Sequence, residues 1–208
     1  MTQKADTKFK REPKRGSHEF QLACEVLDAG KVGHVGFTLD DQPYVVPMSY
    51  ARLDEQLLIH GSVASRLMKN LAGGLRCCVT VTHFDGLVYA RSTFNSSMNY
   101  RSVMVFGNAR LITDIDEKRR SIQALVDHLM PGRRADLRKS TIKELNATSM
   151  LALPIETYSV KRRMGPPSDS KSDMDAQVWA GVVPLELTPG EPVDAPDLLP
   201  GIKRPDYL

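Results

Sequence analysis

The chain has 208 residues, of which 41% are hydrophobic and 25% are charged, and its formal net charge is +3. This composition is typical of a folded globular protein and excludes a disordered chain, a collagen-like chain and a small disulfide framework. No apolar run approaches the roughly 20 residues of a membrane-spanning helix, and so small a positive charge does not by itself indicate a nucleic-acid partner. The first residues lack an apolar secretory stretch, so we expect a cytoplasmic protein without a membrane partner.

The three cysteines, Cys24, Cys77 and Cys78, form no C-x-x-C motif of the kind that binds zinc or exchanges disulfides. Cys77 and Cys78 are neighbours on a predicted strand, where adjacent side chains point to opposite faces, so they are not expected to pair. We predict buried or half-buried thiols in a reducing compartment.

The chain begins with a polar, basic segment, residues 1–16, which has no apolar periodicity and predicts a flexible arm. An apolar stripe with helical spacing follows, with Ser17 in position to cap the helix and Gly30 after its last turn. The sequence of Thr141 and Glu144 fits a capping box, which predicts a helix start at Thr141. The predicted helices cover residues 17–29, 62–73, 114–129 and 134–147.

Short β-branched segments between turn residues predict antiparallel strands, because the first connections are too short for parallel crossovers. Asp85 and Gly86 have the composition of a tight hairpin. Pro47 indicates that its strand lies at an edge or contains a bulge, because proline cannot donate a ladder hydrogen bond. The predicted strands cover residues 32–39, 43–51, 57–61, 75–84, 87–92, 100–113, 151–163 and 178–187.

These elements predict a mainly β (α+β) fold, a β-barrel of six to eight antiparallel strands with peripheral helices. The barrel domain is expected at residues 17–187, and its loop at residues 165–177 is rich in Pro, Ser and Asp. A Pro-rich tail is expected at residues 188–208.

The most informative stretch is Ile59–Lys69, in which a strand ends, small residues follow and a helix begins. Hydroxyl and cationic groups gather there as in phosphate sites. The alternative is a serine that merely caps a surface helix, with solvated cations, and helix caps are the commoner case. The residues concerned are His60, Gly61, Ser62, Ser65, Arg66 and Lys69.

A few other residues are candidates for the site, each with a plainer alternative. Arg101 and Ser102 start a strand at the expected barrel rim, where a surface arginine is the commoner explanation. Trp179 belongs by default to a core or a dimer interface and otherwise stacks near a flat cofactor. His60 is a candidate proton donor, although strand-end histidines are more often structural. The histidines show no metal-ligand spacing, and no G-x-S-x-G, P-loop or dinucleotide motif is present.

The stretches KRGSHE, VGHVGF, YVVPMSY, LLIHGSVASR, CCVTVTHFDGLVYARS, SMNYRSVMVFGNARL, LALPIE and VWAGVVPL occur in this order over most of residues 14–187. Together they resemble the pyridoxamine 5′-phosphate oxidase-like, FMN-binding split-barrel superfamily. The branch most similar contains flavin-nucleotide-binding proteins, including nitroimidazole-resistance reductases.

The resemblance implies a split barrel that binds FMN between the two subunits of a homodimer. The ribityl chain and phosphate would lie at His60–Arg66, with Lys69 as second cation because Leu67 stands where the oxidases have lysine. Ser102 replaces a flavin-contacting glutamine, and Trp179 would reach the partner's flavin. The missing C-terminal R-x-H ending argues against vitamin B6 oxidation. The segment beside the isoalloxazine would be Val46, Pro47, Met48, Ser49 and Tyr50.

The leading hypothesis is a homodimeric FMN-dependent oxidoreductase of an unknown small molecule, with Ser49 near N5 and His60 as the candidate catalytic group. The alternative is a non-catalytic or regulatory flavin or haem binder on the same barrel. Nucleic-acid binding is not expected and has only the basic residues 4–15 in its favour.

Overall fold

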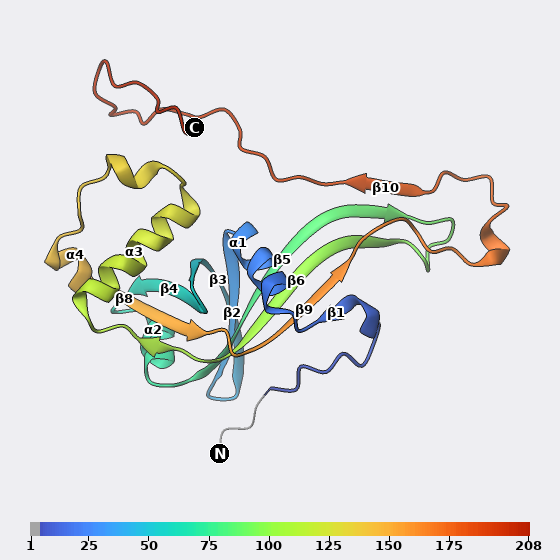
Figure 1. Ribbon diagram of the computed structural model, residues 1–208, viewed down its shortest axis with the longest axis horizontal. Coiled ribbons are helices and arrows are strands. Elements are labelled where there is room, and N and C mark those ends of the chain that lie inside the picture. The colour runs from blue at the N-terminus through green and yellow to red at the C-terminus, as the bar shows by residue number, and fades with distance from the viewer. Residues whose placement is uncertain (1–4) are drawn as a thin grey trace.

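The computed structural model describes residues 5–208, and within them ten strands form one antiparallel sheet with four α-helices (Figure 1). Helices α2, α3 and α4 lie at one end of the sheet and α1 near its middle. The strand order is β1-β9-β6-β5-β2-β3-β4-β8-β7, and β10 pairs with β5. This confirms the predicted mainly β antiparallel barrel with peripheral helices. The strand count exceeds the expected six to eight partly because β1 and β7 have only two residues each.

The bounds of the elements are as follows. The strands are β1 (Gly16–Ser17), β2 (Val32–Leu39), β3 (Gln42–Leu53), β4 (Gln56–Ser62), β5 (Arg76–Tyr89), β6 (Ser97–Asn108), β7 (Arg110–Leu111), β8 (Thr148–Pro154), β9 (Thr157–Arg163) and β10 (Gly181–Pro184). The helices are α1 (Phe20–Ala29), α2 (Arg66–Ala72), α3 (Ile115–Leu129) and α4 (Ile142–Ala147).

Strand β3 pairs with β2 over its first part and with β4 over its last part. Each part therefore has one neighbouring strand and one open edge. Residues 42–49 pair with β2, whereas residues 50–53 pair with β4. Pro47 lies in the part with a single neighbouring strand, so its missing N–H costs no ladder bond. The predicted edge position of Pro47 is therefore confirmed.

Two hydrophobic clusters lie on the two sides of β4. The larger one fills the barrel and includes Leu57 and Ile59 together with α1 and the buried face of α2. The smaller one includes Leu58 and packs against Leu125 of α3. Because strand side chains alternate, β4 separates an interior that contacts α2 from an outer surface that α3 covers.

The end of α1 is held by side chains from distant parts of the chain. Tyr50 Oη donates to the carbonyl of Leu27 (2.5 Å), His83 Nε2 to that of Val26 (2.9 Å) and His128 Nε2 to that of Gly30 (2.6 Å). These bonds satisfy carbonyls that a helix end leaves without partners. Tyr50 is fully buried, and desolvation raises the pKa of its phenol.

The prediction that Ser17 caps α1 is wrong. Ser17 belongs to β1, which pairs with β9, and the N-cap residue is Glu19, without a side-chain cap. The Ser17 hydroxyl instead accepts a bond from the Glu19 N–H (3.1 Å). By contrast, the capping box of Thr141 and Glu144 is present, and it opens the short helix α4.

Two predicted boundaries inside the sheet are also wrong. Asp85-Gly86 is no hairpin turn, because β5 continues through it with a register shift, and the connection to β6 follows Tyr89. A Cβ on Gly86 would lie 2.9 Å from the Val183 carbonyl oxygen, so this glycine admits β10. The predicted strand 151–163 is two strands, β8 and β9, which pair with different neighbours.

The two ends of the described chain are extended segments, and the C-terminal one runs across the top of the view in Figure 1, with Leu187 and Val193 almost fully exposed. Residues 1–4 of the predicted flexible arm lie outside the described residues, and Lys161 Nζ donates to the carbonyl of Arg11 further along it (3.2 Å). The final segment runs from β10 back toward α3, where Tyr207 Oη donates to Asp136 (2.5 Å). The arm's flexibility stays a prediction.

The predicted burial of the thiols is confirmed. Cys24 and Cys77 are buried, Cys78 is half-buried, and all three are free. Burial raises the pKa of Cys77 to about 11, so this thiol is protonated at neutral pH. In the described part of the chain, no helix has the length and hydropathy needed to cross a membrane.

Candidate functional site

The predicted site residues at the end of β4 point to two sides of the sheet. A Cβ on Gly61 would lie 2.9 Å from Met68 Cγ of α2, so Gly61 faces the barrel interior. His60, one residue earlier, lines a cavity on the opposite side, next to α3. The sequence places His60 and Gly61 in one motif, and the strand's alternation separates their surroundings.

Arg66 begins α2 and carries a charge that no acidic side chain neutralises. Its guanidinium carbon lies 4.9 Å from the ring centroid of Tyr44 on β3, and within residues 5–208 it has no ion pair. Ser65 caps α2 by accepting the Met68 N–H (3.5 Å), and Ser62 accepts the Ala64 N–H (3.2 Å). Both hydroxyls remain able to donate, so this corner presents one free cation and two hydroxyl groups.

Lys69 is exposed on the next turn of α2 but lies toward another part of the surface. It lines a hollow of about 330 Å³ together with Leu111, Lys118 and Thr148, between α2, β7 and β8. Arg66, by contrast, lies over the start of β3. The chain therefore brings Lys69 near the predicted phosphate region without placing it beside Arg66.

The predicted flavin-facing segment of β3 alternates between the two sides of the sheet. Val46 and Met48 pack against the barrel core, and Tyr50 is fully buried. Pro47 is exposed and Ser49 half-buried on the outer side. Since residues 42–49 form an edge, their backbone groups on one side have no strand partner and can contact a ligand.

The remaining candidates lie elsewhere within one chain. Arg101 forms a bidentate ion pair with Asp85 (2.7 and 2.9 Å), which raises the pKa of Arg101. Arg101 pairs with His83 near the far end of β5, whereas Gly107 pairs with Cys77 near its start. Arg101 and Gly107 are six residues apart on β6, which corresponds to about 20 Å. Ser102 Oγ donates to the Lys161 carbonyl (3.2 Å). Trp179 is 66% exposed beside β10, with its ring 5.6 Å from that of Tyr89.

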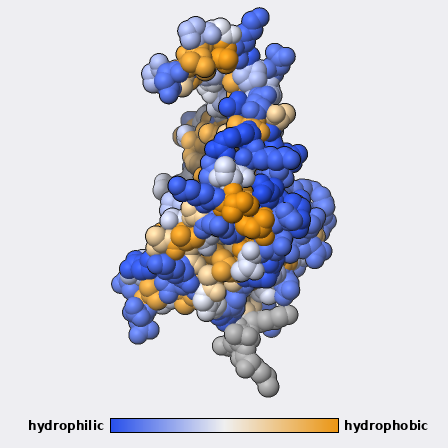
Figure 2. All heavy atoms as spheres, turned by 90° about the vertical axis from the view of Figure 1, so that its left-hand side faces the viewer, coloured by the Kyte–Doolittle hydropathy of each residue, from blue (hydrophilic) through white to orange (hydrophobic). Residues whose placement is uncertain are grey.

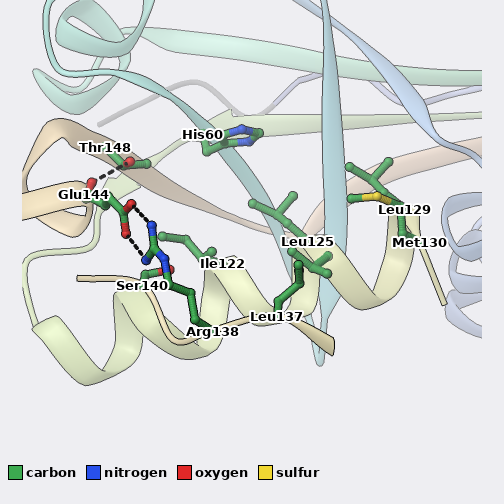
Figure 3. Close-up of a pocket in the computed structure, with 11 residues that line it drawn as sticks. His60, Ile122, Leu125, Leu129, Met130, Leu137, Arg138, Ser140, Glu144 and Thr148 are labelled. Atoms are coloured by element: carbon green, nitrogen blue, oxygen red, sulfur yellow. Dashed lines mark hydrogen bonds and ion pairs between the residues drawn. The ribbon is translucent and has the colours of Figure 1, made fainter. Parts of the chain in front are cut away.

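The cavity beside His60 has a volume of about 520 Å³ and lies between β4, α3 and the segment that follows α3 (Figure 3). His60 projects from β4, whereas Leu125 and Leu129 come from α3. The Nδ1 atom of His60 is buried and has no hydrogen-bond partner among residues 5–208. Burial also lowers the pKa of His60, so its imidazole is neutral at pH 7.

The mouth of this cavity combines exposed apolar residues with an ion pair. Met130 and Leu137 are 49% and 43% exposed, and orange hydrophobic side chains are visible among blue ones at this end of the molecule (Figure 2). Arg138 and Glu144 form two short contacts at the edge, which hold the pKa of Glu144 down to about 2. An apolar ligand in this cavity would therefore lie near the Arg138–Glu144 ion pair at the mouth and the His60 imidazole inside.

The sequence interpretation missed the residues that α3 and Tyr44 contribute. The apolar stripe of α3 includes Ile122 and Leu125, and the sequence predicts an amphipathic helix there without indicating a cavity. Its Leu129 and Met130 continue the stripe to an exposed end, which is a signal of a partly uncovered apolar face. Tyr44 gave no such signal, because its contact with Arg66 joins two separate elements.

Within residues 5–208, no group of three or more His, Cys, Asp or Glu side chains could hold a metal ion. The fold and the order of its elements are those of a known family: the family model described as pyridoxamine 5′-phosphate oxidase matches residues 21–162. The chain belongs to this family. No curated protein sequence matches it significantly.

Solved structures of pyridoxamine 5′-phosphate oxidase-like split barrels agree with this assignment. The FAD and heme binding protein from Mycobacterium smegmatis has a TM-score of 0.89 and 40% identity, over 93% of this chain and 95% of that chain. The flavocytochrome Anf3 from Azotobacter vinelandii gives 0.91 and 37%, over 98% and 95%. A 5-nitroimidazole antibiotic resistance protein from Bacteroides thetaiotaomicron shares the fold, with a TM-score of 0.61 and 21% identity over 71% and 86%.

Proposed function

We propose that this protein is a flavin-dependent redox protein that binds the FMN group, common to FMN and FAD, along the edge of β3. The observation that carries the proposal is Arg66, a guanidinium without a carboxylate partner in the described chain, beside an unpaired strand edge. A flavin phosphate would supply the missing negative charge in a charge-assisted hydrogen bond. The family and the two most similar structures described above support this choice.

The residues around Arg66 fit such a group. The Ser62 and Ser65 hydroxyls can donate to phosphate oxygens, and the free backbone of residues 46–49 can bond the polar edge of a flat ring. A bound flavin supplies hydride and electron transfer, while the protein positions and tunes it. The chain's own task is to bind the phosphate, hold the ring against β3 and limit access of water.

Reconstitution with FMN tests this proposal. The purified protein is expected to be yellow or to take up added flavin, with quenched flavin fluorescence. Arg66→Gln should weaken binding about 10- to 100-fold, as expected for losing a hydrogen bond between charged groups. Arg120→Gln, an exposed arginine of α3, is the matched control. A wild-type protein that stays colourless and takes up neither FMN nor FAD overturns the proposal.

Turnover separates the oxidoreductase from a non-catalytic flavin binder. Reduction by a nicotinamide nucleotide followed by reduction of a nitro or quinone acceptor supports the enzyme. Tight flavin binding without turnover supports the binder. His60→Ala tests whether His60 is catalytic: loss of turnover with unchanged flavin affinity would support that role.

The assembly we propose is a homodimer formed through the outer face of the sheet. Register places Thr80, Met104 and Ser159 side by side across β5, β6 and β9, and all three are exposed or half-buried. These three side chains are uncharged, although Lys161 lies two residues further along β9 on the same face. A partly apolar sheet surface of this kind suits a two-fold contact with a second copy. Met104→Glu should convert a dimer to a monomer in light scattering, whereas Leu111→Glu, at an exposed site of β7, should not.

A second candidate function is haem binding in the His60 cavity. A b-type haem needs an apolar cleft and commonly one histidine nitrogen as iron ligand. The cavity offers apolar side chains of α3 and the buried, unpartnered Nδ1 of His60. The lowered pKa keeps this imidazole neutral, as a metal ligand must be. The relatives described as a heme binding protein and a flavocytochrome support this candidate.

Titration with hemin tests the second candidate. Wild-type protein should bind one equivalent with a sharp Soret band. His60→Ala should weaken binding at least tenfold and change the spectrum, while His34→Ala, an exposed histidine of β2, should behave as wild type. Equal spectra for all three proteins would contradict a role of His60 as ligand.

A further inference from the structure

Arg66 carries its charge at the end of a long, exposed side chain, and the helix start fixes only its backbone. Ser65 caps α2 by accepting the Met68 N–H (3.5 Å), and Asn70 Nδ2 donates to the Arg66 carbonyl (2.8 Å). Neither contact reaches the guanidinium. Because the guanidinium has no ion pair within residues 5–208, its orientation depends on another contact.

The ring of Tyr44 supplies that contact, and the barrel core fixes the ring. The guanidinium carbon of Arg66 lies over the Tyr44 ring, 4.9 Å from its centroid. Tyr44 pairs with Phe37 across β3 and β2, and their two rings stack with centroids 5.3 Å apart and planes at 15°. Phe37 is 7% exposed and belongs to the cluster that fills the barrel. A chain of contacts therefore leads from the packed core through Phe37 and Tyr44 to Arg66.

This contact differs chemically from the ion pair that holds Arg101. Asp85 binds the N–H groups of Arg101 through two short contacts (2.7 and 2.9 Å), and its carboxylate neutralises the arginine charge. An aromatic ring attracts a guanidinium through its quadrupole and brings no net charge of its own. Arg66 therefore keeps its full charge, and its N–H groups remain able to donate to an anion.

We propose that Tyr44 is a positioning residue, which holds the Arg66 guanidinium ready for the flavin phosphate. The inference rests on the proposed binding of the FMN group at Arg66. An arginine that is already held loses less side-chain freedom when an anion binds, so the ring raises affinity without touching the ligand. The effect requires the phosphate. Riboflavin has the same isoalloxazine and ribityl chain but no phosphate, so its binding should not depend on Tyr44.

The test compares the dissociation constants of FMN and riboflavin, measured by flavin fluorescence, in variants of Tyr44. Tyr44→Leu keeps an apolar side chain against Phe37 but removes the ring. It should weaken FMN binding about three- to tenfold, the size of a cation–π contact, and change riboflavin binding by less than about twofold. Tyr44→Phe keeps the ring and should bind FMN within about twofold of wild type. Tyr158→Leu is the matched control and should change neither affinity, because Tyr158 is also half-buried and packs against a phenylalanine, Phe20.

A double-mutant cycle with Arg66→Gln separates positioning from a general structural role. In the Arg66→Gln background, Tyr44→Leu should change FMN binding by less than about twofold, because the contact it removes is already absent. Equal losses in both backgrounds, or equal losses for FMN and riboflavin, overturn the inference, because the effect would then bypass Arg66 and the phosphate. A Tyr44→Phe variant as weak as Tyr44→Leu also overturns it, because the hydroxyl would then be the group that acts.

The same measurements distinguish this inference from the proposed flavin site. If Arg66→Gln weakens FMN binding and Tyr44→Leu does not, the positioning role fails and the flavin site stands. If the wild-type protein binds no flavin, both proposals fail.

Discussion

The two sides of β4 carry different chemistry although they differ by a single residue in the sequence. On the α3 side, His60 is a half-buried, neutral base with an enclosed Nδ1 atom, and aliphatic side chains surround it. On the α2 side, Gly61 makes room for Met68, and Arg66 presents an unneutralised charge at the surface. One strand can therefore serve an apolar, base-requiring ligand and an anionic ligand at once, because alternation keeps the two environments apart.

Leu58→Ala should have the largest effect, and it acts on the α3 side alone. Leu58 is 1% exposed and packs with Leu125, so truncation leaves a cavity under α3 that costs about 2–5 kcal/mol of unfolding free energy. Urea denaturation measures this loss, with Leu111→Ala at an exposed position as control. Hemin affinity should fall more than FMN affinity. Equal losses of both would show that the two sides are not independent.

Gly61→Val is the corresponding change on the α2 side and should cost less, about 1–3 kcal/mol. The new side chain would overlap Met68 Cγ and displace α2 with Arg66. Urea denaturation and FMN titration should both report the change, while hemin affinity stays within about threefold. If FMN binding is unaffected, the position of α2 does not govern the phosphate site.

Acid should reduce stability first on the α3 side, where two half-buried histidines, His60 and His128, lie. Burial is the main cause that lowers the pKa of His60 and of His128 from the ordinary value of 6.5. Below about pH 6.5 the unfolded chain takes up protons that the folded chain does not, so stability present above that pH is lost as the pH falls. Urea midpoints between pH 7.5 and 5.5 should decrease, and less steeply in the His60→Gln, His128→Gln double variant. An unchanged slope in that variant would assign the acid sensitivity to other groups.

Lys69→Gln should have the smallest effect on FMN affinity, and it tests whether Lys69 contacts the flavin phosphate directly. Because Lys69 lies toward β7 and β8, it acts on the flavin phosphate only through solvent. We expect FMN affinity to fall about two- to threefold, and the difference to vanish at high salt. A loss as large as that of Arg66→Gln would instead make Lys69 a direct phosphate ligand.

Local signals in the sequence were sufficient for much of the fold. The period of α3 and the capping box at Thr141 are encoded within a few residues, and the structure contains both. For the start of α3 the sequence offers Asp114 or Asp116, and the structure has Asp114 as the N-cap. The missing N–H of Pro47 predicts an edge strand or a bulge, and the pairing of β3 shows the edge. These features need no knowledge of distant partners.

Features that depend on long-range pairing could not be predicted in the same way. Asp85-Gly86 has turn composition, but Arg101 holds Asp85 and β10 requires Gly86, and both contacts come from elsewhere in the chain. The same ion pair occupies Arg101, which the sequence offers as a free cation. Likewise, no local sequence pattern shows that His60 and Arg66 lie on different sides of the sheet. This follows only from the pairing of β4 in the folded structure.

The carbonyls at the end of α1 have a consequence for the order of folding. Their partners Tyr50, His83 and His128 are 23, 57 and 98 residues away from the carbonyls they bind. Contacts of such sequence separation require closure of long loops and form slowly. We therefore expect the carbonyls at the end of α1 to gain these partners only once β3, β5 and α3 have assembled, which pulse-labelled hydrogen exchange can follow.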